Sequence, residues 1–200
     1  MAIKRWKFNL FTVVLVMAHS SYLAACTTAQ QEGAVPFASY SAVQKIDTIP
    51  GPFVNKIYVS ADKERQDASL GGKVVTTIIR RDKGVAWLLI PKSKHYQEVA
   101  LDTTQVASIQ AQFPDAHKRL LGKEQLNGRH TQKYAYSDTS GRELGLAWVT
   151  DNGVVMKSEL FEDLDNGKPK ATISLQDLQF GKQQLSLFEI PSGYSKLNTE

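Results

Sequence analysis

The sequence predicts a mainly β fold of the α+β class, built on an antiparallel sheet, and three observations predict it. The turn-forming dipeptide Asn-Gly occurs three times, at Asn127-Gly128, Asn152-Gly153 and Asn166-Gly167. This dipeptide supplies the positive φ values that a tight two-residue hairpin turn requires. The segments between turns are short and tend to alternate apolar with polar residues, and only one stretch has a helical period.

The chain begins with the features of a secretory leader. Three basic residues and no acidic one precede an apolar run, residues 8–18, which is too short to span a bilayer core of about 30 Å. Small residues end the run just before Cys26, the single cysteine of the chain. We therefore expect a signal peptide, a flexible tether and a folded domain, at residues 1–25, 26–36 and 37–200.

The stretch Leu23-Ala24-Ala25-Cys26 resembles the lipobox of bacterial lipoproteins, which reads Leu, small, small, Cys. The resemblance implies that lipid is attached to the Cys26 sulfur, and that the leader is cleaved before this residue. Two or three acyl chains anchor a protein stably, since each buried CH₂ contributes about 0.8 kcal/mol. By the enteric sorting rule, Thr27 in place of Asp implies the outer membrane, with the domain facing the periplasm. The alternative is an ordinary signal peptide followed by an incidental free thiol.

The charge of the chain does not indicate a partner. The 24 basic residues slightly outnumber the 20 acidic ones, and cleavage of the leader removes three basic residues, so the remainder is nearly neutral. We therefore expect no nucleic-acid partner. With one cysteine the fold has no internal disulfide. We expect a monomer without a cofactor.

The alternating segments are predicted to be strands separated by turns at Gly71-Gly72 and at residues 82–84. Pro91 lacks an amide donor, so it predicts an edge, a bulge or a bend. The predicted strands cover residues 40–48, 54–61, 74–81, 85–90, 129–137, 144–150, 154–160 and 171–175, and the strand at 85–90 is expected to continue past Pro91 into residues 96–100.

One stretch has the period of a helix. Its apolar residues are Val106, Ile109, Phe113, Ala116 and Leu120. Gly122 is the predicted stop signal. Pro114 interrupts the stretch, so either one helix kinks there or a second helix begins there.

Strands, a helix and further strands behind a lipobox resemble the superfamily of LolA, LolB and RseB, and more closely a branch described as outer-membrane lipoprotein-sorting-like. The resemblance implies a strongly curved antiparallel sheet, a half-open β-barrel wrapped around one or two helices. It assigns no catalytic residue. Four stretches carry it: residues 80–89 (RRDKGVAWLL), 90–98 (IPKSKHYQE), 126–134 (LNGRHTQKY) and 187–194 (LFEIPSGY).

The resemblance also implies a concave apolar surface that accepts an acyl chain or a lipoprotein. Aromatic side chains and an adaptable methionine suit such a pocket. The predicted ligand-binding residues are Ile78, Trp87, Leu89, Leu146, Trp148 and Met156. The basic residues expected at its rim, in contact with phosphate headgroups, are Arg80, Arg81, Lys92, Lys94 and His95. A one-residue slip in strand register would place the predicted ligand-binding residues on the opposite face of the sheet. The alternative is that the ligand-binding residues belong to the core and that the rim residues are ordinary surface residues.

Enzymatic functions find little support in the sequence. No two of His95, His117 and His130 have a metal-ligand spacing such as HExxH. Gly71-Gly72-Lys73 lacks the upstream glycine of a phosphate-binding loop, and Ser192 is not in a nucleophile elbow. We therefore expect neither an enzyme nor a metal site. The alternative to lipid binding is an interaction or sensor scaffold of the RseB type, with an envelope protein as partner.

Overall fold

The computed structural model describes residues 39–48, 51–70, 73–101, 115–161 and 168–197. The predicted signal peptide and tether, Cys26, the Gly71-Gly72 turn and the helical-period stretch up to residue 114 lie outside these ranges. Leader cleavage and lipidation of Cys26 therefore stay predictions. Within the described ranges, no helix is long and apolar enough to cross a membrane.

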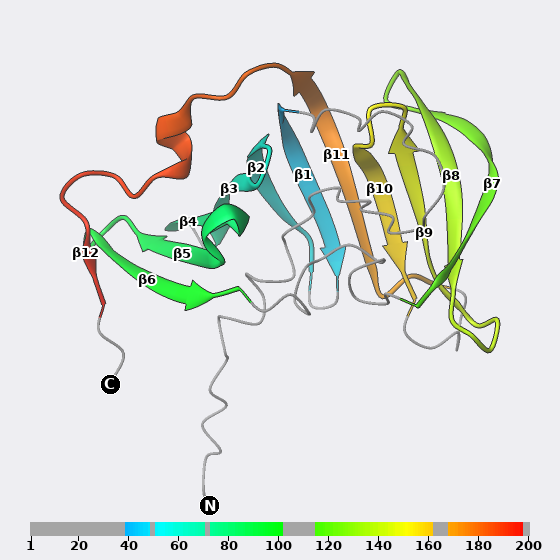
Figure 1. The fold of residues 1–200 in the computed structure, drawn as a ribbon, viewed down its shortest axis with the longest axis horizontal. Coiled ribbons are helices and arrows are strands. Elements are labelled where there is room, and N and C mark those ends of the chain that lie inside the picture. The colour runs from blue at the N-terminus through cyan, green and yellow to red at the C-terminus, as the bar shows by residue number, and fades with distance from the viewer. Residues whose placement is uncertain (1–38, 49–50, 71–72, 102–114, 162–167, 198–200) are drawn as a thin grey trace, which may run out of the picture.

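The described residues form one curved, open sheet of twelve strands (Figure 1). The strands are β1 (Tyr40–Thr48), β2 (Phe53–Ser60), β3 (Lys63–Leu70), β4 (Lys73–Arg80), β5 (Val85–Ile90), β6 (His95–Ala100), β7 (His117–Leu126), β8 (Arg129–Ser137), β9 (Glu143–Thr150), β10 (Val155–Leu160), β11 (Ala171–Phe180) and β12 (Ser195–Lys196). Two 3-10 turns accompany them, η1 (Arg81–Lys83) and η3 (Leu185–Phe188).

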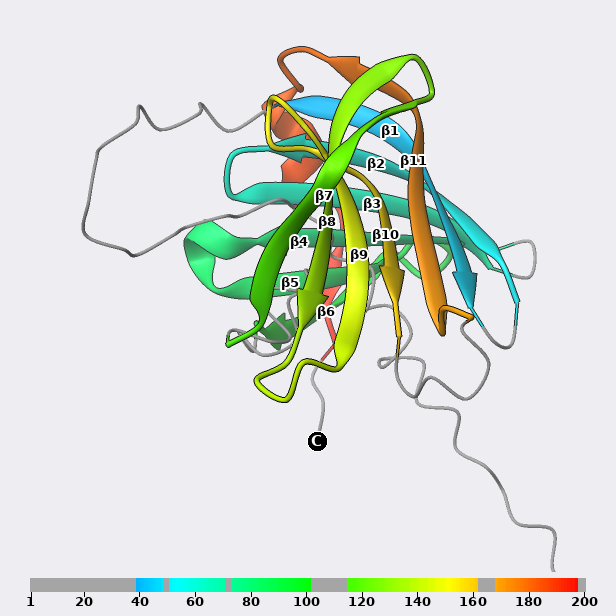
Figure 2. The same ribbon diagram turned by 90° about the vertical axis from the view of Figure 1, so that its right-hand side faces the viewer.

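The sheet consists of two meanders joined by one pairing. Its strand order is β12-β6-β5-β4-β3-β2-β1-β11-β10-β9-β8-β7. The pairing of β1 with β11 joins β1–β6 to β7–β11, and only β12 pairs in parallel, with β6. Seen from the side, β7 and β8 cross in front of the remaining strands (Figure 2). Strands β6 and β7 are consecutive in the chain but lie toward opposite edges of the sheet.

The predicted strands are confirmed, with ends that differ by about one residue except that β11 continues to Phe180. The expected continuation past Pro91 is wrong, because β5 ends at Ile90 and β6 turns back to pair antiparallel with it. Three further strands, β3, β7 and the two-residue β12, were not predicted. The predicted helix is wrong at its C-terminal end, because Leu120 lies in strand β7. In the described part of the chain, the sheet wraps around no α-helix.

The predicted Asn-Gly turns have different outcomes. Asn127 and Gly128 have φ values of 48° and 75°, which confirms the tight turn between β7 and β8. In the turn between β9 and β10, Gly153 has a positive φ of 78° but Asn152 does not. The third pair, at residues 166–167, lies outside the described residues.

Strand register divides the side chains between two faces, which we name after one residue of each. The Tyr40 face carries Tyr40, Ala42, Gln44, Ile46, Asn55, Ile57, Val59, Glu64, Gln66, Thr77, Ile79, Met156, Ser158, Ile173 and Leu175. The Trp87 face carries Lys45, Tyr58, Arg65, Ile78, Arg80, Trp87, Leu89, Lys133, Leu146, Trp148 and Lys157.

Each face contributes its own buried apolar cluster. On the Tyr40 face, the cluster gathers side chains of β1, β2, β10 and β11, among them Tyr40, Ile57 and Met156. On the Trp87 face, the cluster joins Ile78, Trp87 and Leu89. Burial on both faces of the first meander indicates that both contribute to stability.

Candidate functional site

The predicted ligand-binding residues do not lie together. All except Met156 lie on the Trp87 face, and Met156 lies on the Tyr40 face. Within the Trp87 face they form two separate groups. Ile78, Trp87 and Leu89 belong to β4 and β5, whereas Leu146 and Trp148 belong to β9, beyond the β1–β11 pairing. Their role in ligand binding stays a prediction.

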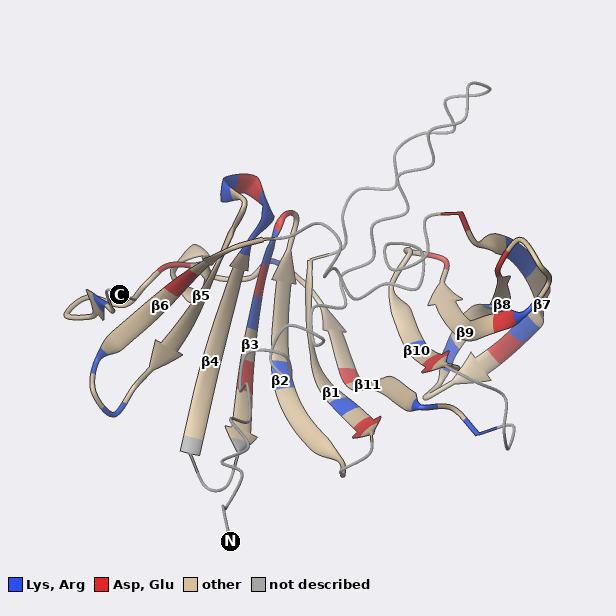
Figure 3. Ribbon diagram, turned by 90° about the horizontal axis from the view of Figure 1, so that it is seen from below, with Lys and Arg blue, Asp and Glu red and all other residues tan. Residues whose placement is uncertain are grey.

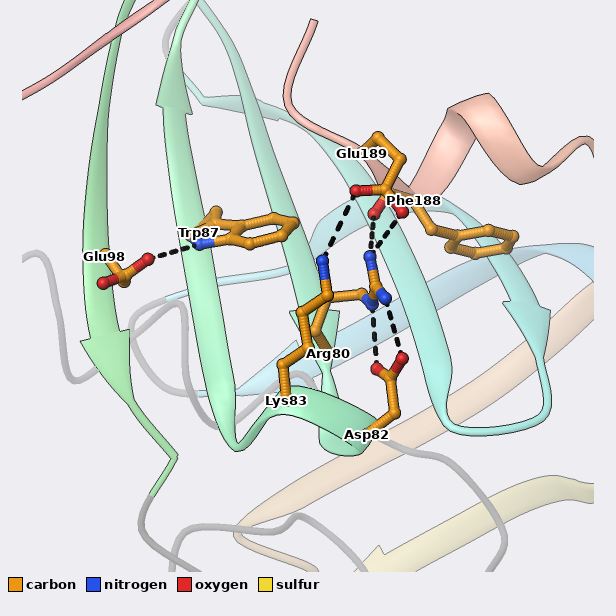
Figure 4. Close-up of polar contacts among 7 residues, drawn as sticks. All are labelled: Arg80, Asp82, Lys83, Trp87, Glu98, Phe188 and Glu189. Atoms are coloured by element: carbon orange, nitrogen blue, oxygen red, sulfur yellow. Dashed lines mark hydrogen bonds and ion pairs between the residues drawn. The ribbon is translucent and has the colours of Figure 1, made fainter.

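The C-terminal segment, residues 182–197, covers the first of these groups. Phe188 of η3, drawn with Arg80 and Trp87 in Figure 4, is fully buried and packs in one cluster with Ile78, Trp87 and Leu89. Leu187, Ile190 and Tyr194 add to the cluster from the same segment. The chain itself therefore occupies the apolar surface that the sequence assigned to a ligand.

Arg80 holds this segment in place. Its Nη1 donates to the Phe188 carbonyl at 3.2 Å and to Glu189 Oε1 at 2.6 Å. Its Nε and Nη2 donate to the two carboxylate oxygens of Asp82 at 2.8 and 2.7 Å. The bond from Arg80 lowers the pKa of Asp82 below its usual value. Nearby, Arg65 Nη1 donates to the Leu187 carbonyl at 3.3 Å.

Trp87 connects the covered cluster to the sheet edge. Its Nε1 donates to Glu98 Oε2 at 2.9 Å, and Lys196 of β12 donates to Glu98 Oε1 at 2.6 Å. The Lys83 ammonium lies 5.2 Å from the Trp87 ring centroid, a favourable cation–π distance. These contacts fix both ends of the C-terminal segment, so this region has a structural role.

Trp148 is covered by lysine side chains. Register places it opposite Lys133 of β8 and Lys157 of β10, whose ammonium groups lie 4.7 and 4.6 Å from its ring centroid. Its Nε1 donates to Glu124 Oε2 at 2.7 Å, and this bond is the main reason that the pKa of Glu124 is lowered. Trp148 is 4% exposed as a whole residue, and the two lysine ammonium groups lie against its ring.

The five predicted rim residues do not form one rim. Arg80 is buried on the Trp87 face, whereas the guanidinium of its neighbour Arg81 reaches Glu64 on the Tyr40 face. Lys92, Lys94 and His95 lie at the opposite end of β5, in or next to its turn to β6. The six residues of β5 span about 20 Å. Their contact with lipid headgroups stays a prediction.

The Tyr40 face carries a row of buried polar side chains that the sequence analysis missed. Asn55 Nδ2 donates to Gln44 Oε1 at 3.1 Å, and Gln66 Nε2 donates to Glu64 Oε1 at 2.7 Å. Arg81 Nη2 pairs with Glu64 Oε2 at 2.9 Å. In β3, residues 64, 66 and 68 are buried in the alternating pattern of a strand. Two of them are polar, so the sequence does not show the apolar alternation that would have predicted this strand.

Several donors on this face have no partner among the described residues. The buried atoms are Gln44 Nε2, Arg81 Nη1 and Ser158 Oγ. Gln44 is 0% exposed, and buried polar groups are normally hydrogen-bonded. The apolar cluster that contains Met156 adjoins them. In this arrangement, donors without a partner among the described residues lie next to apolar side chains.

The described part of the chain shows no group of three or more His, Cys, Asp or Glu residues that could hold a metal ion. Among the described residues, Lys and Arg positions alternate with Asp and Glu positions along the strands (Figure 3). Many are neighbours of opposite charge, such as Lys45 with Asp47 at 3.3 Å and Lys157 with Glu159 at 2.6 Å.

The family described as "Domain of unknown function (DUF4412)" matches residues 48–157. None of the curated proteins matches the chain.

Solved structures with the same fold are distant in sequence. An uncharacterised conserved protein from Thermus thermophilus has a TM-score of 0.57 at 11% identity, over 80% of this chain and 90% of that one. MucB, in the MucA/MucB complex of Pseudomonas aeruginosa, has a TM-score of 0.52 at 14% identity, over 79% of this chain and 57% of that one. A LolA superfamily protein from Nitrosomonas europaea matches at 11% identity over 77% and 91%, with a TM-score of only 0.38. The likeness to the Thermus protein and to MucB shows that this chain has the fold of MucB.

Proposed function

This chain belongs to the DUF4412 family, and we propose that it is a non-enzymatic envelope protein that binds an acyl chain or lipid on the Tyr40 face. The lipobox at residues 23–26 supports the location, a domain held by lipidated Cys26 at the periplasmic side of the outer membrane. The fold shared with MucB is compatible with this function. The proposal moves the binding surface from the Trp87 face, where the sequence analysis put most of it, to the opposite face.

One observation carries the proposal. Gln44 Nε2 is buried and unpartnered within the described residues, next to an apolar cluster that includes Met156. Leaving a buried donor without a partner costs about 1–3 kcal/mol, which a bound polar group would recover. On the Trp87 face, by contrast, Phe188 fills the cluster of the first meander and lysines cover Trp148.

A purified soluble form that starts at residue 27 is expected to release lipid on solvent extraction, in amounts close to one molecule per protein by mass spectrometry. Met156→Asp is expected to lower that amount at least tenfold, because it places a charge in the apolar cluster. Val54→Asp is the matched control, since Val54 is 50% exposed on strand β2 and lies on the opposite face of the sheet. Circular dichroism checks that both variants fold. A folded Met156→Asp protein that retains as much lipid as Val54→Asp would contradict the proposal.

A second candidate function, binding of an envelope protein, is favoured by the edge strand β7. Leu120 and Leu121 are 52% and 42% exposed there, and an edge strand offers unpaired backbone groups to a partner. Basic side chains at Lys118, Arg119 and Lys123 favour an acidic segment. The likeness to MucB, solved with MucA, is consistent with such a role.

A photo-crosslinking residue in place of Leu121 tests this second function in envelope preparations. We expect one discrete crosslinked protein, and its yield should fall at least fivefold when Lys118 and Arg119 are both changed to Glu. The control places the photo-crosslinking residue at Leu185, which is also exposed and lies far along the chain from β7. Equal crosslinking from both sites would exclude β7 as a specific interface.

A further inference from the structure

We infer that the Tyr40 face recognises the neutral ester or amide carbonyl of an acylated ligand and discriminates against a free carboxylate. The inference rests on the proposed lipid binding and specifies which polar group the ligand carries. Three features of the polar row support it: its position in the strand register, its net charge and its unused donors.

The register places the polar row diagonally across the apolar face. Gln44 of β1 lies opposite Asn55 of β2. One step further along the face, Gln66 of β3 lies opposite Ile57, and two steps further Glu64 lies opposite Val59. Paired side chains on neighbouring strands are about 5 Å apart, and diagonal neighbours about 7–8 Å. A ligand on the apolar cluster would therefore have polar groups within reach.

The polar row has no net charge. Its two ionised side chains, Glu64 and Arg81, form an ion pair at 2.9 Å, and Glu64 is 0% exposed. Gln44, Asn55 and Gln66 are neutral amides. Tyr40 stays a neutral phenol, because burial, followed by the nearby Glu64 charge, raises its pKa well above the usual value.

A carboxylate placed here would add a buried charge that nothing in the row neutralises. Burial of an unpaired charge is far more costly than burial of a hydrogen-bonded neutral group. An ester or amide carbonyl instead accepts hydrogen bonds and adds no charge. Of the donors without a partner among the described residues, Gln44 Nε2 and Arg81 Nη1 lie at opposite ends of the row, and each suits a carbonyl oxygen.

Three probes with one acyl chain test this selectivity: oleamide, methyl oleate and oleate. Their affinities for the delipidated protein, starting at residue 27, are measured by isothermal titration calorimetry at pH 8. We expect oleamide and methyl oleate to bind at least tenfold more tightly than oleate. If no probe binds, the proposed function fails. If all three bind equally, or oleate binds most tightly, the inference is overturned while lipid binding stands.

Two variants identify the residues responsible. Gln44→Leu is expected to weaken oleamide about tenfold, the loss typical of one hydrogen bond, with a much smaller effect on oleate. Glu64→Gln is expected to shift the preference toward oleate, because the Arg81 charge then lacks its partner. Ser174→Ala, on the Trp87 face of β11, is the control and should change no affinity. A Gln44→Leu protein that binds all three probes like the wild type would contradict the assigned role of Gln44. This test does not depend on whether Glu64→Gln folds.

Discussion

Phe188→Ala is expected to lower the free energy of unfolding by about 3–5 kcal/mol, the range for removing a buried aromatic side chain. Phe188 is fully buried against Ile78, Trp87 and Leu89, so its loss leaves a cavity between the C-terminal segment and the sheet. Urea denaturation followed by circular dichroism measures the change.

Leu185→Ala is the matched control for Phe188→Ala. Leu185 belongs to the same 3-10 turn but is 63% exposed, so its truncation should change stability by less than about 0.5 kcal/mol. Equal effects of the two substitutions would show that the segment is not anchored through Phe188.

Arg80→Met is expected to cost about 2–3 kcal/mol. Its guanidinium is only 5% exposed and bonds the Phe188 carbonyl, Glu189 and Asp82 at once. Removal of a buried charged partner leaves the remaining groups unsatisfied, although the partial exposure of both carboxylates reduces the cost. The same denaturation experiment measures it. Glu189→Gln, at a side chain that is 52% exposed, should cost less than about 1 kcal/mol.

The pH dependence distinguishes loss of the Arg80–Asp82 pair from a general loss of packing. The folded pKa of Asp82 is lowered by Arg80, so this contribution is present above the unfolded pKa, about 3.9, and is lost as the pH falls through the folded value. Wild-type stability should therefore fall more steeply below pH 4 than that of Arg80→Met. Parallel pH profiles would contradict the assignment.

Much of the sheet was predictable because apolar alternation and turn residues mark most of its strands. Strand β3 escaped prediction because Glu64 and Gln66 occupy positions where a buried apolar residue was expected. These side chains are buried because polar partners on the same face satisfy them, and those partnerships arise only from the three-dimensional register. The helical period through Ala116 and Leu120 misled for a different reason. Strand β7 is an exposed edge, so its apolar spacing is not set by a core.

The candidate site was less predictable than the fold. Trp148 and Met156 were predicted to line one pocket. A register shift between Val155 and Lys157 pairs Trp148 with Lys157, so Met156 lies on the opposite face. Such bulges alter which side a residue faces and leave no clear mark in the sequence. The role of Phe188 also depends on a long-range contact, since η3 packs on strands that precede it by more than 100 residues. Local patterns give no information about that contact.

The pairing of β1 with β11 has a kinetic consequence. Within each meander, neighbouring strands are consecutive in the chain, so they can pair with short loop closures. The β1–β11 pairing instead encloses β2 to β10 in a single chain loop (Figure 1). Contacts of such high sequence separation slow folding, because the entropy of closure is lost before the contact forms. We therefore expect the two meanders to form first, and their junction, which makes the sheet continuous, to form late.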